Sequence, residues 1–422
     1  MENLFLLLII LIVLLVIIGY SAVNNRKMQK YTLEKIKNSY GQPCDREYKY
    51  GEYSHIAGYA NNHSSEYTVD DITWNDLNMD EVYRQMNYTQ SSAGDEYLYY
   101  LLRNPRLTGS APEGFEEKIK YYSENEDSRL KLQTALYKCG RTGKYSIYDY
   151  LNNLDVIANE NFNKDIWLLL LYAAAFGASF VHPFGMVALV GLLAYGGITY
   201  FSTKKRIEPY IISFAYVFRV LKGADTICGV KDATIKKEQE RLKELKLSMG
   251  SFSRFSYIVM SQNGGTGNIL EILLDYINIF FHLDIIKFFH MRNELKKNWD
   301  KIDEILTITG YIDSIIAIGC YRAYLQSWCV PEFDTSENGH YEATQIYHPL
   351  LTDPVGNNVD LKRGIILTGS NASGKSTMLK TLTIGAILAQ SINTVPALYY
   401  RAPAYKIYTS LALTDDILAG ES

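Results

Sequence analysis

Uninterrupted apolar runs mark two parts of the chain as candidate membrane segments. The first run, Asn3 to Tyr20, carries no charge, and at about 1.5 Å per helical residue it just crosses a hydrocarbon core of roughly 30 Å. Basic residues follow the run at Arg26, Lys27 and Lys30, and none precedes it. A cleaved signal peptide would have a basic start, and basic residues favour the cytoplasmic side. The pattern therefore predicts an uncleaved anchor followed by cytoplasmic chain.

The second apolar run, residues 166–201, also lacks charge, and its length suits two short membrane spans. His182-Pro183 lies near its middle, where proline disfavours a continuous helix. Basic residues flank both ends, with Lys164 before the run and residues 204–206 after it, so both ends are expected on the cytoplasmic side. The pattern predicts a membrane hairpin. A buried soluble helical hairpin is the alternative.

Elsewhere the periodicity of apolar positions predicts packed soluble helices. Residues 269–289 are apolar but contain several ionisable side chains, which are costly in lipid, so we expect a packed helix there. His282 and His290 lack the spacing of metal ligands and are expected to pack helices. A helix is also expected from Met79 to Leu102, and long helices over residues 207–330. Two apolar faces with three-four spacing support the latter: Ile235, Leu242, Leu245 and Met249, then Leu295, Trp299, Ile302, Leu306 and Thr309.

Composition narrows the class of protein. The chain has 422 residues, enough for two or three domains, and a formal net charge of -4 from 42 basic and 46 acidic residues. A general polybasic nucleic-acid binder is therefore excluded, and any contact with DNA must be local. The five cysteines are odd in number and form no CxxC motif, so we expect reduced thiols in a cytosolic setting rather than a disulfide framework or a zinc ribbon.

The candidate chemistry lies in the last part of the chain, after a polar stretch that follows Pro331. Residues 369–376 match the phosphate-loop pattern GxxxxGK[ST]. The apolar residues 365–367 before the loop predict a short buried strand, and residues 377–390 after it predict an amphipathic helix. A glycine-bent backbone that opens onto a helix N-terminus directs N–H groups at phosphate oxygens. The predicted nucleotide-binding residues are Gly369, Ser370, Asn371, Ala372, Ser373, Gly374, Lys375, Ser376 and Thr377.

Two side chains of this loop have assigned roles. Lys375 would reach the β- and γ-phosphates of ATP, and the Ser376 hydroxyl would ligate Mg²⁺, so these two are the candidate catalytic residues and Ser376 the candidate metal ligand. His348-Pro349, with the segment 355–358, precedes the expected strand at a place where an adenine could rest. Taken alone, these residues form a turn, and Asp415-Asp416 near the end starts a helix.

The segment from Ile366 to Ala397 resembles the ATPase domain of the MutS mismatch-repair family. It reads ILTGSNASGKSTMLKTLTIGAILAQSINTVPA and shares with the family motifs Thr368, Gly369, Asn371, Gln390, Val395, Pro396 and Ala397, with Ser370 in place of a proline. The segments 348–350 and 355–358 resemble the family's lead-in, and by that resemblance Asn357 lines an adenine pocket. Upstream, residues 303–333 resemble the last core helix. The segment from Asn87 to Gly94 is similar to a pattern in the family's core domain, which continues at Leu98, Leu101, Leu102 and Pro105.

The chain also departs from this family. Residues 21–69 are too short for the mismatch-reading domain, and Phe115-Glu116-Glu117, which spells the family's Phe-x-Glu tripeptide, is expected to be an ordinary helix surface. The membrane hairpin is foreign to the soluble repair proteins. Residues 419–422 resemble the start of the signature segment whose serine acts on a partner's γ-phosphate, and the acidic Walker B strand that would follow is not in the sequence.

The resemblance implies a membrane-anchored, MutS-related branch, and we expect the sequence to be C-terminally truncated. An intact family member would be an ATPase. Phosphoryl transfer needs charge stabilisation and a positioned water, so this chain is expected to bind nucleotide without turnover.

The predicted fold class combines transmembrane helices, a helical core and an incomplete P-loop α/β domain. The predicted domains are an N-terminal transmembrane anchor (1–22), a cytoplasmic core-like segment (23–164), a transmembrane hairpin (165–203), a helical core or lever segment (204–333) and the ATPase domain (334–422).

The predicted function is ATP-dependent, mismatch-repair-like DNA binding at the cell membrane. Its cofactors would be ATP and Mg²⁺, and its partners a homodimer through the ATPase domains, double-stranded DNA and the lipid bilayer. One alternative is a membrane-tethered, nucleotide-switched scaffold without a DNA role. Another is an ABC-type transporter subunit, which three short spans without intramembrane charge disfavour.

Overall fold

The computed structural model describes the chain except for residues 1–18, 21–22, 25, 49–54, 64, 144, 153–162, 251–275, 337–338, 371–373 and 411–422. The chain forms two compact units. Unit 1 comprises residues 1–35, 138–229 and 239–306, and unit 2 comprises residues 36–137, 230–238 and 307–422. Nearly all of the predicted N-terminal anchor, and the whole of the segment 415–422, lie outside the described residues.

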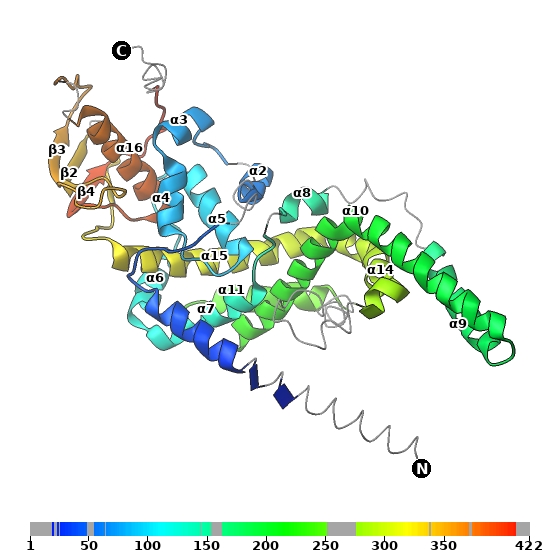
Figure 1. The fold of residues 1–422 in the computed structure, drawn as a ribbon. Helices are drawn as coiled ribbons and strands as arrows, with labels where there is room; N and C mark the ends of the chain where they lie inside the picture. Colours follow the sequence, from blue (N-terminus) through cyan, green and yellow to red (C-terminus); the bar gives the residue numbers. More distant parts are fainter. Residues whose placement is uncertain are drawn as a thin grey trace. The chain divides into compact units, whose positions relative to one another are not determined.

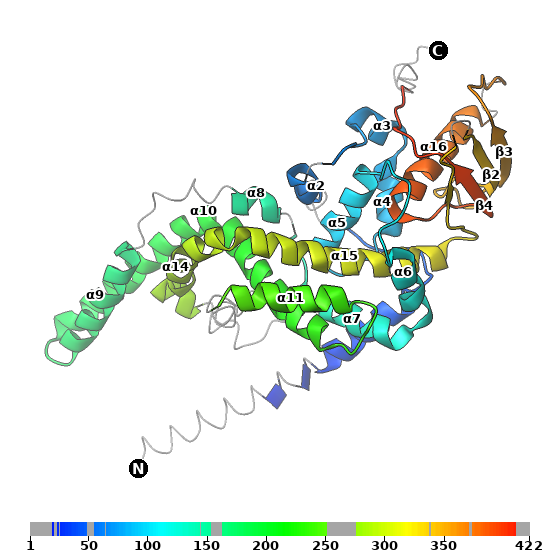
Figure 2. The same ribbon diagram turned by 180° about the vertical axis from the view of Figure 1, so that it is seen from behind.

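The described residues of unit 1 are mostly helical. The helices are α8 (Ile147–Asn152), α9 (Asn163–Ser179), α10 (Pro183–Gly229), most of α11 (Lys236–Ser248), α14 (Leu283–Lys297) and the first part of α15 (Trp299–Tyr324). α9 and α10 lie side by side and are joined at residues 180–182, which confirms the predicted turn at His182-Pro183 (Figures 1 and 2). Pro183 opens α10 because the first helical position needs no backbone N–H donor.

The hairpin of α9 and α10 carries its apolar side chains on the outside. Trp167, Val187 and Ile198 are 66%, 67% and 74% exposed. Within the described residues, α10 and α15 are long and apolar enough to cross a membrane, but only 17% of the apolar window of α10 is buried, against 78% for α15. α15 is therefore a core helix. The described part of the hairpin presents an uncharged apolar surface.

Unit 2 contains short helices, the rest of α15 and a small sheet. The helices are α2 (Gly58–Asn62), α3 (Asp71–Asp76), α4 (Met79–Met86), α5 (Ser92–Arg103), α6 (Phe115–Glu124), α7 (Glu126–Cys139) up to Tyr137, and α16 (Lys375–Ile392). The single helix predicted from Met79 to Leu102 is wrong, since two helices replace it. The Ser91 hydroxyl accepts a hydrogen bond from the Gly94 N–H at 3.1 Å and so begins α5 afresh.

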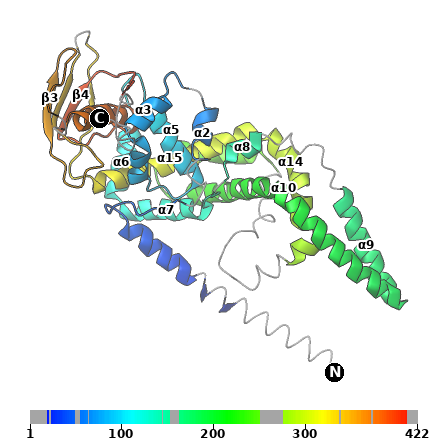
Figure 3. The same ribbon diagram turned by 45° about the horizontal axis from the view of Figure 1, so that its top comes forward.

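The sheet consists of β1 (Glu332–Phe333), β2 (Tyr341–Ile346), β3 (Asn357–Leu361) and β4 (Tyr399–Ala402), in the order β1-β4-β2-β3. β2 is antiparallel to β3 and β4, and β4 is parallel to β1. Figure 3 shows β3 and β4 of this sheet from another direction. α16 lies against β2 so closely that a Cβ on Gly385 would come within 2.9 Å of the Ile346 side chain. A mostly helical chain with a small mixed sheet fits the coarse fold class predicted.

The predicted helical faces form much of the core. Ile235, Leu242, Leu245 and Met249 are buried, as are Leu295, Ile302, Leu306 and Thr309, whereas Trp299 remains partly exposed. The helix predicted over residues 377–390 is confirmed as α16, whose side chains from Ile384 onward are buried. In the stretch 269–289, residues 276–281 and α14 are helical, and residues 269–275 lie outside the described part.

Candidate nucleotide site

The phosphate-loop motif ends in the first turn of α16. Gly374 adopts a left-handed conformation with φ 82°, which glycine tolerates best, and α16 begins at Lys375 directly after it. The Lys375 Nζ donates hydrogen bonds to the backbone carbonyl of Gly369 and, at 2.6 Å, to that of Ser370. The start of the loop and the start of the helix are therefore joined through the lysine. Asn371, Ala372 and Ser373 lie outside the described residues.

The first turn of α16 is open to an anion. The N-cap Gly374 has no side chain to satisfy the first helical N–H groups, and Ser376 and Thr377 are exposed beside them. These N–H groups and the helix dipole favour a negative charge. A charged phosphate oxygen also accepts a stronger hydrogen bond from an ammonium group than a neutral carbonyl does, so it can displace the carbonyl partners of Lys375.

The strand predicted immediately before the loop is wrong. Ile365, Ile366 and Leu367 belong to no described strand, and they are 51%, 92% and 41% exposed. A strand needs a neighbour to accept its hydrogen bonds and to bury its side chains. The described sheet consists of β1 to β4, and none of these strands pairs with residues 365–367.

The predicted adenine contacts lie on the β2–β3 connection. Asn357, the first residue of β3, is exposed, and its side-chain amide donates to the Val355 carbonyl at 3.0 Å. His348 is buried, and its Nδ1 accepts from the Leu350 N–H at 3.3 Å. Burial, and then the nearby Lys380 ammonium, lower the pKa of His348 below its ordinary value, which favours the neutral ring. Lys375 contacts Gly369 and Ser370, whereas Asn357 bonds within its own loop.

The candidate metal ligand Ser376 stands on the exposed first turn of α16. Among the described residues, no group of three or more His, Cys, Asp or Glu side chains is arranged to hold a metal ion. A Mg²⁺ ion here would therefore take most of its oxygen ligands from nucleotide phosphates and water, which is a common arrangement for this ion.

The other end of α16 contacts an ion pair between a buried arginine and a half-buried glutamate, which the sequence did not predict. Arg322 of α15 donates to both carboxylate oxygens of Glu116, at 2.6 and 2.8 Å, and to the carbonyl of Asn393 at 2.8 Å. The Asn393 amide completes the contact by donating to Glu116 at 2.8 Å. Phe115 is 1% exposed. The prediction that Phe115-Glu116-Glu117 is an ordinary helix surface is therefore wrong for Phe115, while Glu116 is half-buried in an ion pair.

Gln390, one of the positions shared with MutS motifs, has a structural role here. Its side-chain amide donates to the carbonyls of Arg106 and Tyr405, at 3.1 and 3.0 Å, and its oxygen accepts from the Tyr405 N–H at 2.9 Å. It is 1% exposed. The last turn of α16 is thereby tied both to the segment after α5 and to the segment after β4.

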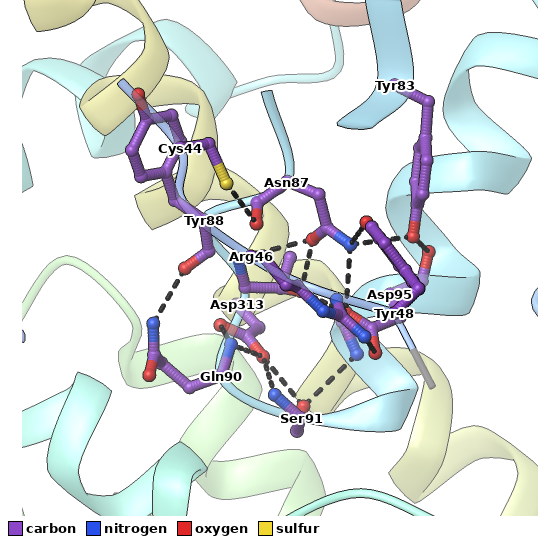
Figure 4. A network of polar contacts seen from close by, with 12 residues as sticks. Cys44, Arg46, Tyr48, Tyr83, Asn87, Tyr88, Gln90, Ser91, Asp95 and Asp313 are labelled. Atoms are coloured by element: carbon purple, nitrogen blue, oxygen red, sulfur yellow. Dashed lines mark hydrogen bonds and ion pairs between the residues drawn. The ribbon is translucent and has the colours of Figure 1, made fainter. Parts of the chain in front are cut away.

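The motif from Asn87 to Gly94 forms the buried junction between α4 and α5 (Figure 4). Asp313 of α15 accepts hydrogen bonds from the N–H groups of Gln90 and Ser91, at 3.0 and 2.9 Å, and from the Ser91 hydroxyl at 2.6 Å. A Cβ on Gly94 would lie 2.2 Å from an Asp313 oxygen, so only glycine fits at this position.

A second carboxylate, Asp95, binds polar side chains on the other side of the motif. It accepts hydrogen bonds from Arg46, Thr89 and Asn87, the last at 3.2 Å (Figure 4). The polar residues of the motif thus fix the junction between two helices.

Several known proteins share part of this sequence. The chain is similar to the DNA mismatch repair protein MutS of Clostridium kluyveri, with 27% identity over 153 residues (33% of this chain and 17% of that protein). For MutS of Fervidobacterium nodosum the figures are 26% over 190 residues (42% and 23%). For MutS of Listeria monocytogenes they are 35% over 97 residues (21% and 11%).

These matches support a MutS-related relationship over about a third of the chain. The matched segments span less than a quarter of the length of these relatives. No protein-family model matches the chain.

Proposed function

We propose that this chain is a membrane-anchored, MutS-related protein that binds Mg²⁺·ATP at the start of α16. Lys375 and Ser376 would contact the terminal phosphates and the metal ion. Gly369, Ser370, Gly374 and the residues between would wrap the triphosphate, and Asn357 would lie near the adenine. The observation that carries the proposal is the Lys375 ammonium, held over the start of the loop by two carbonyls that a phosphate can replace.

Nucleotide titration of the full chain in detergent tests this proposal. Because Lys375 supplies a charge-assisted hydrogen bond worth about 1.5–3 kcal/mol, we expect Lys375→Ala to weaken ATP binding roughly 10- to 100-fold. Lys406→Ala is the matched control, since it removes the same charge from an exposed position after β4 and should bind ATP nearly as the parent does. Equal affinities for the parent and Lys375→Ala would contradict the proposed site.

The membrane part of the proposal rests on the uncharged hairpin. The exposed apolar side chains of α9 and α10, with basic residues beyond both ends of the run, favour a multi-pass protein of the cell membrane whose other parts face the cytoplasm. We also propose a homodimer through the ATPase domains, because a signature serine acting in trans requires a second copy.

Double-stranded DNA is proposed as a partner because the similar proteins are named for DNA mismatch repair. We expect the affinity of the full chain for duplex DNA to fall steeply with salt, since any contact would be made to phosphates. Matched and mismatched duplexes should bind equally, because contacts to phosphates do not read the bases. Fluorescence anisotropy across a salt series measures both. No binding at low salt would contradict the DNA role and favour a scaffold.

A further inference from the structure

Two acidic side chains lie at the base of the hairpin, and both are paired with other groups of the chain. Asp165 at the start of α9 lies 2.6 Å from the Nδ1 of His282, while the Nε2 of the same ring lies 2.8 Å from the Gly196 carbonyl. A carboxylate and a carbonyl only accept hydrogen bonds, so both ring nitrogens carry a proton and His282 is an imidazolium. Burial lowers the pKa of His282, and the two acceptors together raise it above its ordinary value. The positive charge of His282 thereby compensates the negative charge of Asp165.

The second acid is Asp284, at the start of α14. Its side chain is 7% exposed. It accepts a hydrogen bond from the Tyr200 hydroxyl at 2.9 Å and lies 3.9 Å from the Lys204 ammonium. Lys204 also donates to the same Tyr200 oxygen at 2.6 Å. The charges of Asp284 and Lys204 therefore offset each other, and the Asp284 carboxylate is buried.

The basic side chains that remain exposed lie where the apolar surface ends. A hydrogen bond from the Tyr172 hydroxyl to the Leu192 carbonyl fixes the register of α9 against α10 and brings the base of α9 to the level of Tyr200. We call this end of the hairpin the hairpin foot: Lys164 and Trp167 on α9, and Phe201, Lys205 and Arg206 on α10. All five residues are exposed.

The outward charge of the hairpin foot is therefore positive. Lys164 and Lys205 are exposed, and the exposed Trp167 follows Lys164 by three residues on α9. Glu208 is the next exposed acid along α10. In the sequence, the charges of Asp165 and Asp284 balance those of these lysines. In the structure, both acids are paired within the fold, so they do not reduce the exposed positive charge. An aromatic ring and ammonium groups bordering an apolar surface match the interface of a bilayer, where acyl chains meet phosphates.

We propose that the hairpin foot binds the headgroups of anionic phospholipids, with Lys164 and Lys205 as the contacts. This inference rests on the proposed membrane insertion of the hairpin. Each basic residue near an anionic surface contributes about fivefold to affinity. Two lysines therefore enrich anionic lipid around Trp167 by about 25-fold at low salt, and the enrichment falls as salt screens the charges.

Tryptophan quenching in vesicles tests the inference with the full chain. The protein is reconstituted in phosphatidylcholine and phosphatidylglycerol at equal mole fractions, with bromine near the headgroup end of one lipid or the other. We expect brominated phosphatidylglycerol to quench Trp167 far more than brominated phosphatidylcholine. The Trp167→Phe variant identifies the signal of that residue among the four tryptophans.

Paired variants make the test specific. Lys164→Gln combined with Lys205→Gln should equalise quenching by the two lipids. Lys236→Gln combined with Lys237→Gln, which removes the same charge at the start of α11, should leave the preference unchanged. Equal quenching of the parent protein by both lipids overturns the headgroup inference and leaves membrane insertion standing. Quenching of Trp167 by neither lipid overturns the membrane hairpin itself.

Discussion

Replacing Asp313 by alanine is expected to lower the free energy of unfolding by about 3–5 kcal/mol. Asp313 is 1% exposed. Its carboxylate accepts from the Gln90 and Ser91 N–H groups and from the Ser91 hydroxyl. Alanine would leave these three donors without an acceptor, and a buried donor that loses its partner costs about 1–3 kcal/mol. The break between α4 and α5 depends on these bonds.

Thermal unfolding followed by circular dichroism, in the same detergent for every variant, measures this effect. Asp300→Ala is the matched control because Asp300 lies on the same helix, α15, and is exposed. Exposed substitutions of this kind usually change stability by less than about 0.5 kcal/mol. If the two alanine variants unfolded alike, the Asp313 contacts would not hold the motif together.

Replacing Arg322 by methionine is expected to lower the free energy of unfolding by about 1.5–3 kcal/mol, because it removes the charge-assisted hydrogen bonds from the buried guanidinium to the half-buried Glu116 carboxylate. Arg322 is 4% exposed and its guanidinium stacks 4.3 Å from the centre of the Trp328 ring. Methionine keeps much of the volume but cannot donate to Glu116, Asn393 or Thr394. The expected loss therefore reports on hydrogen bonds and charge rather than on a cavity.

A double-mutant cycle separates the ion pair from the other contacts of Arg322. Glu116→Gln alone and combined with Arg322→Met should show a coupling of at least about 1 kcal/mol, since the residues touch. Glu117→Gln is the matched control, because the neighbouring glutamate is exposed. Additive effects of Arg322→Met and Glu116→Gln would contradict the assigned contact between α15 and α6.

Local patterns in the sequence were sufficient to predict several elements. The helix after the phosphate loop, the turn at His182-Pro183 and the buried faces of α11 and α15 follow from glycine, proline and apolar spacing within a few residues. The break within residues 79–102 also had a local signal, the capping hydroxyl of Ser91, but the apolar spacing outweighed it. What these predictions share is that neighbouring residues determine the outcome.

Contacts between distant residues could not be read from one sequence. Arg322 and Glu116 are 206 positions apart, and Asp313 is 222 positions from Ser91, so neither pairing has a sequence signal. The partners of Asp165 and Asp284 could not be predicted for the same reason. The strand expected at residues 365–367 was predicted from its apolar composition, yet a strand also depends on neighbours that composition does not supply.

Amide hydrogen exchange of the full chain, with and without Mg²⁺·ATP, tests the central claim most directly, because it locates the nucleotide. We expect ATP to slow exchange in peptides that cover Gly369 to Leu379, where backbone N–H groups would bind phosphate oxygens. The Lys375→Ala variant should lose this protection at the same ATP concentration. Unchanged exchange over these residues in the parent, or protection confined to another part of the chain, would contradict a phosphate site at the start of α16.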